Sequence, residues 1–314
     1  MKRVAIIIPA YKATFLPAAL DSIAAQTCKD FTLYVGDDCS PEPIGDIVER
    51  YRDKIELVYQ RYDTNLGGKD LVAQWERCIA LSQNEPYVWL FSDDDVLESN
   101  CVEQLIKTIE ATGGAYDLYH FDVKEINEEG KTTKIPSAYP LELTAYDYYK
   151  GKTSGIYRSY VVENVFSRRI YEEKGGFKKF DMAWGSDVAT WCIFCGNRGM
   201  YKISDAHVLW RRSSQNITPD RSQQTAERKL MSECSFLNWT YEYFHFEKNI
   251  REVNEIWFVK VMRHYEKLVS KESAEKAYNT FFCGHNYKCR EMWARMLIHL
   301  PANVYKLYMY ICHL

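Results

Sequence analysis

The chain has 314 residues and a formal net charge of -3, so it is long enough to bury a sizeable core in one large domain or in one domain with an appendage. The near balance of charge and the absence of a long basic run argue against a dedicated nucleic-acid binder. No uninterrupted apolar stretch approaches the roughly 20 residues that a membrane-spanning helix needs, which argues against a spanning protein.

Strands and helices alternate along the first third of the chain. Apolar, β-branched runs predict strands at 4–8, 31–35 and 55–59, and a further strand from Tyr87 up to the acidic residues that follow it. Apolar residues at helical spacing predict helices at 15–24, 44–51, 71–81 and 100–112, with Thr14 as a start signal for the first. This alternation predicts an α/β fold with a doubly wound, mostly parallel sheet flanked by helices.

The second part of the chain has a less regular pattern. Strands are expected at 117–126, 161–169 and 200–210, and a helix from Asp187 onward. Residues 137–158 have weak periodicity and are interpreted as a loop, either shaping a substrate cleft or forming a plain surface connection. A helical apolar stripe beyond residue 220 predicts a domain at 1–220, with halves 1–110 and 111–220, and a mainly α appendage at 221–314.

Three adjacent carboxylates, Asp93, Asp94 and Asp95, follow the predicted strand that starts at Tyr87. Such neighbours repel one another, and a hard divalent cation with oxygen ligands is the simplest way to neutralise them. Ligands of open α/β sheets bind outside the carboxyl ends of the strands, where these acids are expected. Metal-assisted handling of a phosphate ligand is therefore one interpretation, and a solvated acidic turn capping the next helix is the other.

Four segments occur in one order within the first ~110 residues: VAIIIPAY, LDSIAAQTCKDFTLYVGDDCS, NLGG and WLFSDDDVLE. This series resembles the family 2 glycosyltransferases of GT-A fold, with weaker similarity in VFSRRIYEEKGGF, WGSDVATW and VLWRRSSQNIT. The resemblance implies an inverting transfer of a sugar from a nucleoside diphosphate to an acceptor hydroxyl in polysaccharide or glycolipid synthesis. Residues 1–110 would then bind the nucleotide and residues 111–220 the saccharide or lipid-linked saccharide acceptor.

The resemblance also implies a set of nucleotide-sugar-binding residues from several loops: Pro9, Ala10, Tyr11, Asp37, Asp38, Asn65, Gly67, Lys69, Asp93 and Arg212. Asp37, with Asp38 as second candidate, would accept a hydrogen bond from the imide N–H of a pyrimidine, which favours a UDP-sugar and places a dTDP-sugar next. Turn capping is the alternative for both acids. For Lys69 the alternative is a solvated side chain.

The acidic cluster departs from the pattern Asp, any residue, Asp, Asp, because Ser92 stands in the first acidic place. By the resemblance Asp94 is the best metal ligand, Asp93 lies beside the ribose or the metal, and Asp95 coordinates or orients a ligand. Oxygen ligands bridging a diphosphate favour Mn²⁺ or Mg²⁺. His207 is a further candidate ligand, although packing is the more ordinary role.

Inverting transfer needs a carboxylate to take the proton of the acceptor hydroxyl. The resemblance places this base at the start of a helix, where Ser186 and Asp187 stand and Ser186 replaces the usual acid. Asp187 is therefore predicted as general base, and helix N-capping is its alternative. Trp184 and Trp191 flank it and could stack on an acceptor sugar, with core packing as the alternative.

Cysteines offer a second metal hypothesis. Cys192 and Cys195 have metal-ligand spacing, and Cys283, His285 and Cys289 could complete a zinc site. Packing of Cys192 and Cys195 as small apolar side chains in a helix is the favoured alternative. Ten cysteines without a signal peptide predict a reducing, cytoplasmic compartment.

The last segment, 293–314, mixes aromatic, apolar and basic residues, which would suit peripheral contact with a membrane surface or a helix packed on the protein or a partner. The sequence as a whole predicts a metal-dependent, inverting glycosyltransferase. The alternatives are a nucleotide-sugar-binding homologue without catalysis, prompted by Ser92 and Ser186, and a nucleotidyltransferase.

Overall fold

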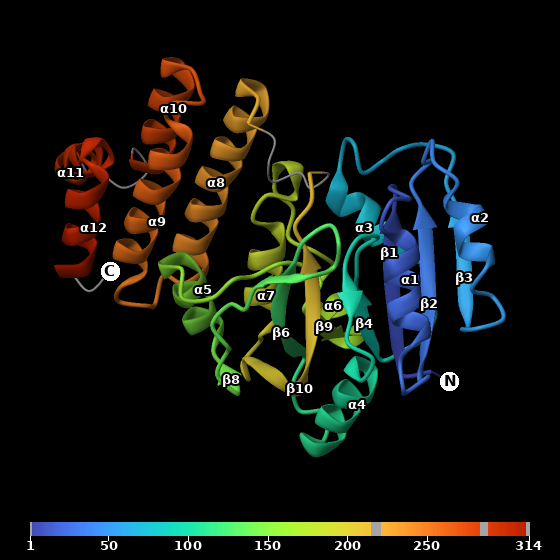
Figure 1. Ribbon diagram of the computed structural model, residues 1–314. Helices are drawn as coiled ribbons and strands as arrows, with labels where there is room; N and C mark the ends of the chain where they lie inside the picture. The colour runs from blue at the N-terminus through green and yellow to red at the C-terminus, as the bar shows by residue number, and fades with distance from the viewer. Residues whose placement is uncertain (1, 215–220, 283–287, 312–314) are drawn as a thin grey trace.

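The computed structural model describes residues 2–214, 221–282 and 288–311 (Figure 1). A ten-stranded sheet lies at its centre, with the order β3-β2-β1-β4-β9-β6-β10-β5 and with β7 and β8 paired to β6 and β10. The strands are β1 (Val4–Ala10), β2 (Phe31–Asp37), β3 (Leu57–Arg61), β4 (Tyr87–Leu90), β5 (Val96–Leu97), β6 (Leu118–Ile126), β7 (Thr132–Lys134), β8 (Glu142–Leu143), β9 (Asn164–Ser167) and β10 (Met200–Arg211).

The sheet is mostly parallel, as predicted. β1 pairs in parallel with β2 and β4, β2 with β3, and β6 with β10, whereas β9 runs antiparallel between β4 and β6. Ala10 is paired with Asp37, and Ile7 with Leu90. The loops that follow β1, β2 and β4 therefore leave the sheet at the same edge, where ligands of open α/β sheets bind.

Helices cover both faces of this sheet (Figure 1). The side chains of β1 alternate between the two faces and therefore pack in two separate cores. Ile6 and Ile8 pack in the core that contains α1 (Leu16–Ala24), α2 (Ile44–Glu49) and α4 (Cys101–Ala111). Ala5 and Ile7 pack in the core on the other side, whose helices are α3 (Leu71–Ile79), α5 (Ala145–Ser154), α6 (Arg168–Lys174) and α7 (Ser186–Phe194). The continuous apolar strands predicted from the sequence follow from this burial on two faces.

In the part of the chain that the structure describes, five helices follow β10 and lie on the side of α5 and α7, away from β2 and β3 (Figure 1). They are α8 (Gln223–Tyr243), α9 (Ile250–Tyr265), α10 (Lys271–Phe282), α11 (Lys288–His299) and α12 (Ala302–Ile311). Their apolar faces form a third core around Leu230, Phe258 and Phe281. The division of the chain into domains at residue 220 stays a prediction.

Two predictions about local structure were wrong. The segment interpreted as a loop at 137–158 contains α5, which begins where the Thr144 side chain accepts the backbone N–H of Asp147 and ends at Gly155 in the left-handed conformation. Thr14 does not cap α1, since Phe15 occupies the N-cap position and Pro17 lies in the first turn.

The described part of the tail packs on the other helices. The Trp293 indole donates to the Tyr308 hydroxyl at 3.2 Å, and Arg263 of α9 donates to the Leu297 carbonyl at 2.7 Å. Of the helices that the structure describes, none combines the length and apolar character needed to cross a bilayer. Contact of this tail with a membrane surface stays a prediction.

Candidate functional site

Three loops at the carboxyl edge of the sheet are joined by hydrogen bonds. Asp93, just after β4, accepts the backbone N–H groups of Tyr11 and Lys12 on a single oxygen, Oδ2, at 2.8 Å each. The Ser40 hydroxyl, from the loop after β2, donates to the Tyr11 carbonyl at 2.6 Å. The structure thus brings together Pro9, Ala10 and Tyr11 with the acidic cluster, and Tyr11 is exposed beside them.

Asp37 ends β2 with a side chain that has no exposed surface. Its Oδ2 accepts from the Tyr59 hydroxyl and the Arg61 guanidinium at 2.7 Å each, and its Oδ1 accepts the Ser40 N–H at 2.8 Å. Because this carboxylate has no exposed surface and already accepts three protein donors, the geometry disagrees with Asp37 accepting a hydrogen bond from a nucleobase. The carboxylate instead joins the end of β3 to the loop after β2.

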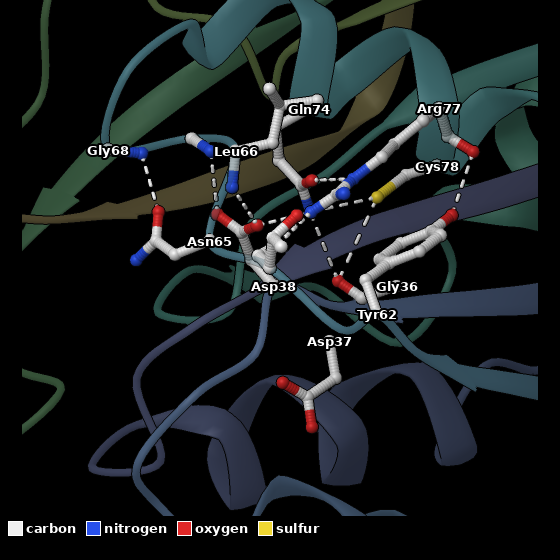
Figure 2. Close-up of polar contacts among 12 residues, drawn as sticks. Gly36, Asp37, Asp38, Tyr62, Asn65, Leu66, Gly68, Gln74, Arg77 and Cys78 are labelled. Atoms are coloured by element: carbon white, nitrogen blue, oxygen red, sulfur yellow. Dashed lines mark hydrogen bonds and ion pairs between the residues drawn. The ribbon is translucent and has the colours of Figure 1, made fainter.

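Asp38 holds the loop that precedes α3 (Figure 2). Its carboxylate accepts the N–H groups of Leu66 at 2.7 Å and Gly67 at 2.8 Å, and it forms an ion pair with Arg77 of α3. The Arg77 guanidinium in turn lies 3.8 Å from the centre of the Tyr62 ring. Figure 2 shows the Asp37 carboxylate pointing away from this cluster, so the two adjacent acids support different loops.

Packing against Asp38 leaves no room for a side chain at Gly67. A Cβ atom there would lie 2.7 Å from Oδ2 of Asp38, closer than real Cβ contacts allow. Asn65 closes the same loop by accepting the N–H of Gly68 at 2.7 Å, while Lys69 is exposed. A close approach of this backbone to a nucleotide stays a prediction; the close approach seen is to Asp38.

The acidic cluster contains three carboxylates in different environments. Asp95 is 2% exposed, and its oxygens accept the Ser92 hydroxyl and the backbone N–H of Arg211, each at 2.6 Å. Burial and the adjacent Asp94 charge raise the pKa of Asp93 to about 6, and burial also raises the pKa of Asp94. A nearby cation would favour the ionised forms of both partly exposed acids.

These environments decide which residues fit a divalent cation. Asp94 and the second oxygen of Asp93 supply hard oxygen donors at the sheet edge. Asp95 does not fit the predicted role of metal ligand, because its buried oxygens already accept protein hydrogen bonds. Within the described residues no group of three His, Cys, Asp or Glu side chains is arranged to hold a metal, so a cation here needs further oxygens from its ligand.

The two arginines at the end of β10 differ in exposure. The Arg212 side chain is 68% exposed and lies 3.7 Å from Glu125, whereas Arg211 is buried. The geometry therefore favours Arg212 as the cation that can meet a ligand. His207 lies earlier on β10, and its Nδ1 is 3.1 Å from Oε2 of Glu98. This contact gives His207 a structural role.

Asp187 lies in the first turn of α7, after Gly185 at the N-cap with φ 92°. N-capping by Asp187 is therefore excluded. Burial raises the pKa of Asp187, and the positive charge of Lys152 opposes this rise. Ser186, which stands where an acid was expected, is buried, and its Oγ accepts the Phe180 N–H at 2.9 Å. It therefore holds the backbone of the segment before α7.

Trp184 and Trp191 have different surroundings. Trp191 has no exposed surface and packs among Phe166, Phe177 and Phe194, so the predicted acceptor contact is wrong for this residue and core packing is right. Trp184 is half-buried and donates its indole N–H to Glu233 of α8. No sequence pattern pointed to Glu233, because its position depends on how α8 packs beside the loop before α7.

The cysteine hypothesis is settled only in part. Cys192 lies in α7 and Cys195 at its C-cap. Both are buried, which raises the pKa of each thiol, and the Cys192 thiol lies 3.9 Å from the Ala145 carbonyl. They pack as apolar side chains. Cys283, His285 and the side chain of Cys289 lie outside the described residues.

The mostly parallel sheet, its flanking helices and the acids at its carboxyl edge define a GT-A glycosyltransferase fold. Residues 5–173 match the family described as Glycosyl transferase family 2, and the chain belongs to that family. It is 31% identical over 133 residues to the poly(ribitol-phosphate) beta-N-acetylglucosaminyltransferase TarS of Staphylococcus aureus, a match that covers 41% of this chain and 22% of TarS. The chain thus spans about a fifth of the length of that curated relative.

Solved structures with the same fold cover nearly the whole chain. The crystal structure of S. aureus TarS 1-349 has a TM-score of 0.58 at 15% identity and covers 95% of this chain and 90% of that one. The same fragment in complex with UDP-GlcNAc has a TM-score of 0.56 at 15% identity, with the same coverage. The mannosyltransferase PcManGT of Pyrobaculum calidifontis, in complex with GDP-Man and Mn²⁺, has a TM-score of 0.54 at 14% identity and covers 94% of this chain and 83% of that one.

Proposed function

We propose that this protein is a metal-dependent, inverting glycosyltransferase that moves a sugar from a UDP-sugar to an acceptor hydroxyl. Family membership supports glycosyl transfer, and the similarity to TarS supports a UDP-sugar donor. The observation that carries the proposal is the shared carboxylate of Asp93, which joins the loop after β1 to the acidic cluster. One donor molecule can then contact both.

The donor site lies across the joined loops. Pro9, Ala10 and the exposed ring of Tyr11 would border the nucleobase, which stacks on apolar and aromatic surface. Asp37 and Asp38 would act mainly through the loops that they hold, with Asn65 and Gly67 lining the nucleotide. Lys69 and Arg212, both exposed, would supply positive charge to the diphosphate.

Asp94, with Asp93, would hold the cation. With Mn²⁺ or Mg²⁺ held by these residues, the negative charge that develops on the departing nucleoside diphosphate would be offset. The two partly buried carboxylates repel each other, and a divalent cation between them would reduce this repulsion.

Asp187 would act as the general base on the acceptor side. Its carboxylate takes the proton from the acceptor hydroxyl while the oxygen attacks the anomeric carbon opposite the diphosphate, and the bond from that carbon to the diphosphate oxygen breaks. The raised pKa of Asp187 makes it a stronger base than an exposed aspartate. Trp184, close by in sequence, would contact the acceptor sugar.

Thermal shift and calorimetric titration with UDP-GlcNAc, UDP-glucose and GDP-mannose, each with and without Mn²⁺, test the donor. We expect stabilisation by the UDP compounds that increases with Mn²⁺; binding of GDP-mannose in preference would overturn the UDP assignment. Asp187→Asn should abolish transfer and leave UDP affinity nearly unchanged, and a fully active variant would contradict the base. Release of UDP separates this function from a nucleotidyltransferase, which releases pyrophosphate, and from a binding protein, which releases neither.

A further inference from the structure

Arg211, at the end of β10, contacts three separate segments through one buried side chain. Its Nε donates to the backbone carbonyl of Asp94 at 2.7 Å. One terminal nitrogen donates to the carbonyls of Asn127 and Glu128 at 2.9 Å each, and the guanidinium lies 4.6 Å from the centre of the Phe15 ring. The side chain is 3% exposed.

Arg211 also holds the acidic cluster through its backbone, since its N–H donates to Oδ1 of Asp95 at 2.6 Å. The stretch from Asp94 to Asp95 is therefore fixed at a carbonyl and at a carboxylate by one residue. A guanidinium has several N–H donors in a rigid planar fork, so it can bond to carbonyls in different directions at once. A lysine ammonium cannot reproduce this arrangement.

The segment at 127–131, between β6 and β7, is an exposed turn. Gly130 adopts φ 79° there, and its N–H donates to the Asn127 carbonyl at 3.0 Å. The Glu128 carboxylate accepts the backbone N–H of Ser214 at 3.0 Å, which attaches the turn to the chain beyond β10 as well. The carbonyls that Arg211 binds thus belong to an exposed turn that contains none of the proposed donor-binding residues.

An open hollow of about 600 Å³ lies beside this contact. It is lined by Phe15, Leu97, Ile126, Gly130 and Arg211, among others. The turn therefore borders open space on this side, so packed core does not block its displacement.

We propose that Arg211 is a positioning residue that transmits the conformation of the turn at 127–131 to the backbone of Asp94, so that this turn sets the affinity of the acidic cluster for its divalent cation. The inference rests on the proposed function, because it takes Asp94 as the cation ligand. It also differs from a direct role, in which Arg211 would contact the donor diphosphate.

The test uses the full chain and two readouts. The first is the affinity for Mn²⁺ in the presence of UDP, measured by electron paramagnetic resonance, together with UDP affinity in EDTA. The second is amide hydrogen exchange in the peptide covering residues 91–97. The variants are Arg211→Lys, Gly130→Val, which strains the turn without touching the acids, and Lys131→Met as the matched control in the same turn.

Arg211→Lys and Gly130→Val should each weaken Mn²⁺ affinity by about tenfold, in the range seen when residues that orient metal ligands are replaced. Exchange at 91–97 should rise in both, UDP affinity in EDTA should stay within about twofold, and Lys131→Met should match the wild type. Combining the two changes should weaken Mn²⁺ affinity by less than the product of the single effects, because they break one connection.

Loss of UDP affinity in EDTA for Arg211→Lys, with no effect of Gly130→Val, would assign Arg211 to the diphosphate and overturn this inference. Wild-type Mn²⁺ affinity in both variants would overturn it as well, while the proposed function stands. A wild-type protein that binds neither UDP nor Mn²⁺ would overturn the proposed function, and the cation step of this inference with it.

Discussion

Trp184 donates its indole N–H to Oε1 of Glu233 at 2.8 Å, and Oε2 of the same carboxylate accepts the indole N–H of Trp257 at 3.0 Å. The ammonium of Lys229 lies 4.7 Å from the Trp184 ring centre, and that of Lys152 lies 4.7 Å from the Trp257 ring centre. These five residues connect the loop before α7 with α5, α8 and α9. The helices after residue 220 therefore help to hold the residues beside Asp187.

Glu233→Leu should lower the free energy of unfolding by about 2–4 kcal/mol, because the buried carboxylate holds two indole donors and hydrogen bonds to charged groups contribute about 1.5–3 kcal/mol each. Urea denaturation measures the change. UDP affinity should stay at the wild-type value, since the donor loops are elsewhere. Glu242→Gln, an exposed change on the same helix, is the control, and equal stability of Glu233→Leu and this control would contradict the prediction.

Gly67→Ala should weaken UDP binding by roughly tenfold, because its Cβ would meet the Asp38 carboxylate, which Arg77 holds in place. Gly68→Ala is the matched change one residue later, where the new Cβ would lie 2.8 Å from the Asn65 amide oxygen, in a more exposed side chain that can move. Calorimetric titration with UDP compares them. A larger loss for Gly68→Ala would show that the Asp38 contact does not shape the nucleotide loop.

The pH dependence of stability should report on Glu163, a residue with no exposed surface just before β9. Tyr160 donates its N–H to Oε1 at 2.6 Å, and burial raises the pKa of Glu163 to about 8. The folded protein keeps this proton at neutral pH while the unfolded chain has released it, so the contribution of Glu163 is complete below about pH 4 and is lost as the pH rises towards 8.

Glu163→Gln mimics the protonated form and should remove this dependence. Urea denaturation at pH 5.5 and pH 8.0 should show the wild type losing more stability between the two conditions than the variant does. An identical change in both proteins would mean that Glu163 is ionised in the folded state.

Asp94→Asn and Asp95→Asn should affect different properties, the first Mn²⁺-dependent UDP binding and the second stability. Asp94→Asn should remove the Mn²⁺-dependent part of UDP affinity with little change in stability, because the side chain is partly exposed at the sheet edge. Asp95→Asn should cost about 1–3 kcal/mol of stability, since an amide presents only one acceptor oxygen to the two donors, Ser92 and Arg211. Stable Asp95→Asn protein that has lost Mn²⁺ binding would reverse the two roles.

The sequence predicted the seven longer strands and the edge at which their loops meet, because continuous apolar runs followed by polar turns depend only on local pattern. It missed β5, β7 and β8, which have only two or three residues each. It missed α5, although Thr144, Asp147 and Gly155 are start and stop signals at suitable spacing. The apolar face of α5 is built mainly from tyrosines, which hid the helical period. Tyr148 and Tyr149 are fully buried there.

The roles of neighbouring acids could not be separated from sequence. Asp37 and Asp38, or Asp94 and Asp95, have the same chemistry, and their partners come from distant segments. Asp38 depends on Arg77 and Asp95 on Arg211, and neither pairing has a sequence signature. For such residues the fold decides which acid is buried and which one remains open to a ligand.

One oxygen of Asp93 accepts two backbone N–H groups of the loop after β1. This contact matters for any redesign of the donor preference. The loop after β1 and the loop after β4 depend on each other for their conformation, so replacing either one with the loop of another transferase would disturb the other. Grafts intended to change the preferred sugar donor should therefore transplant both segments together.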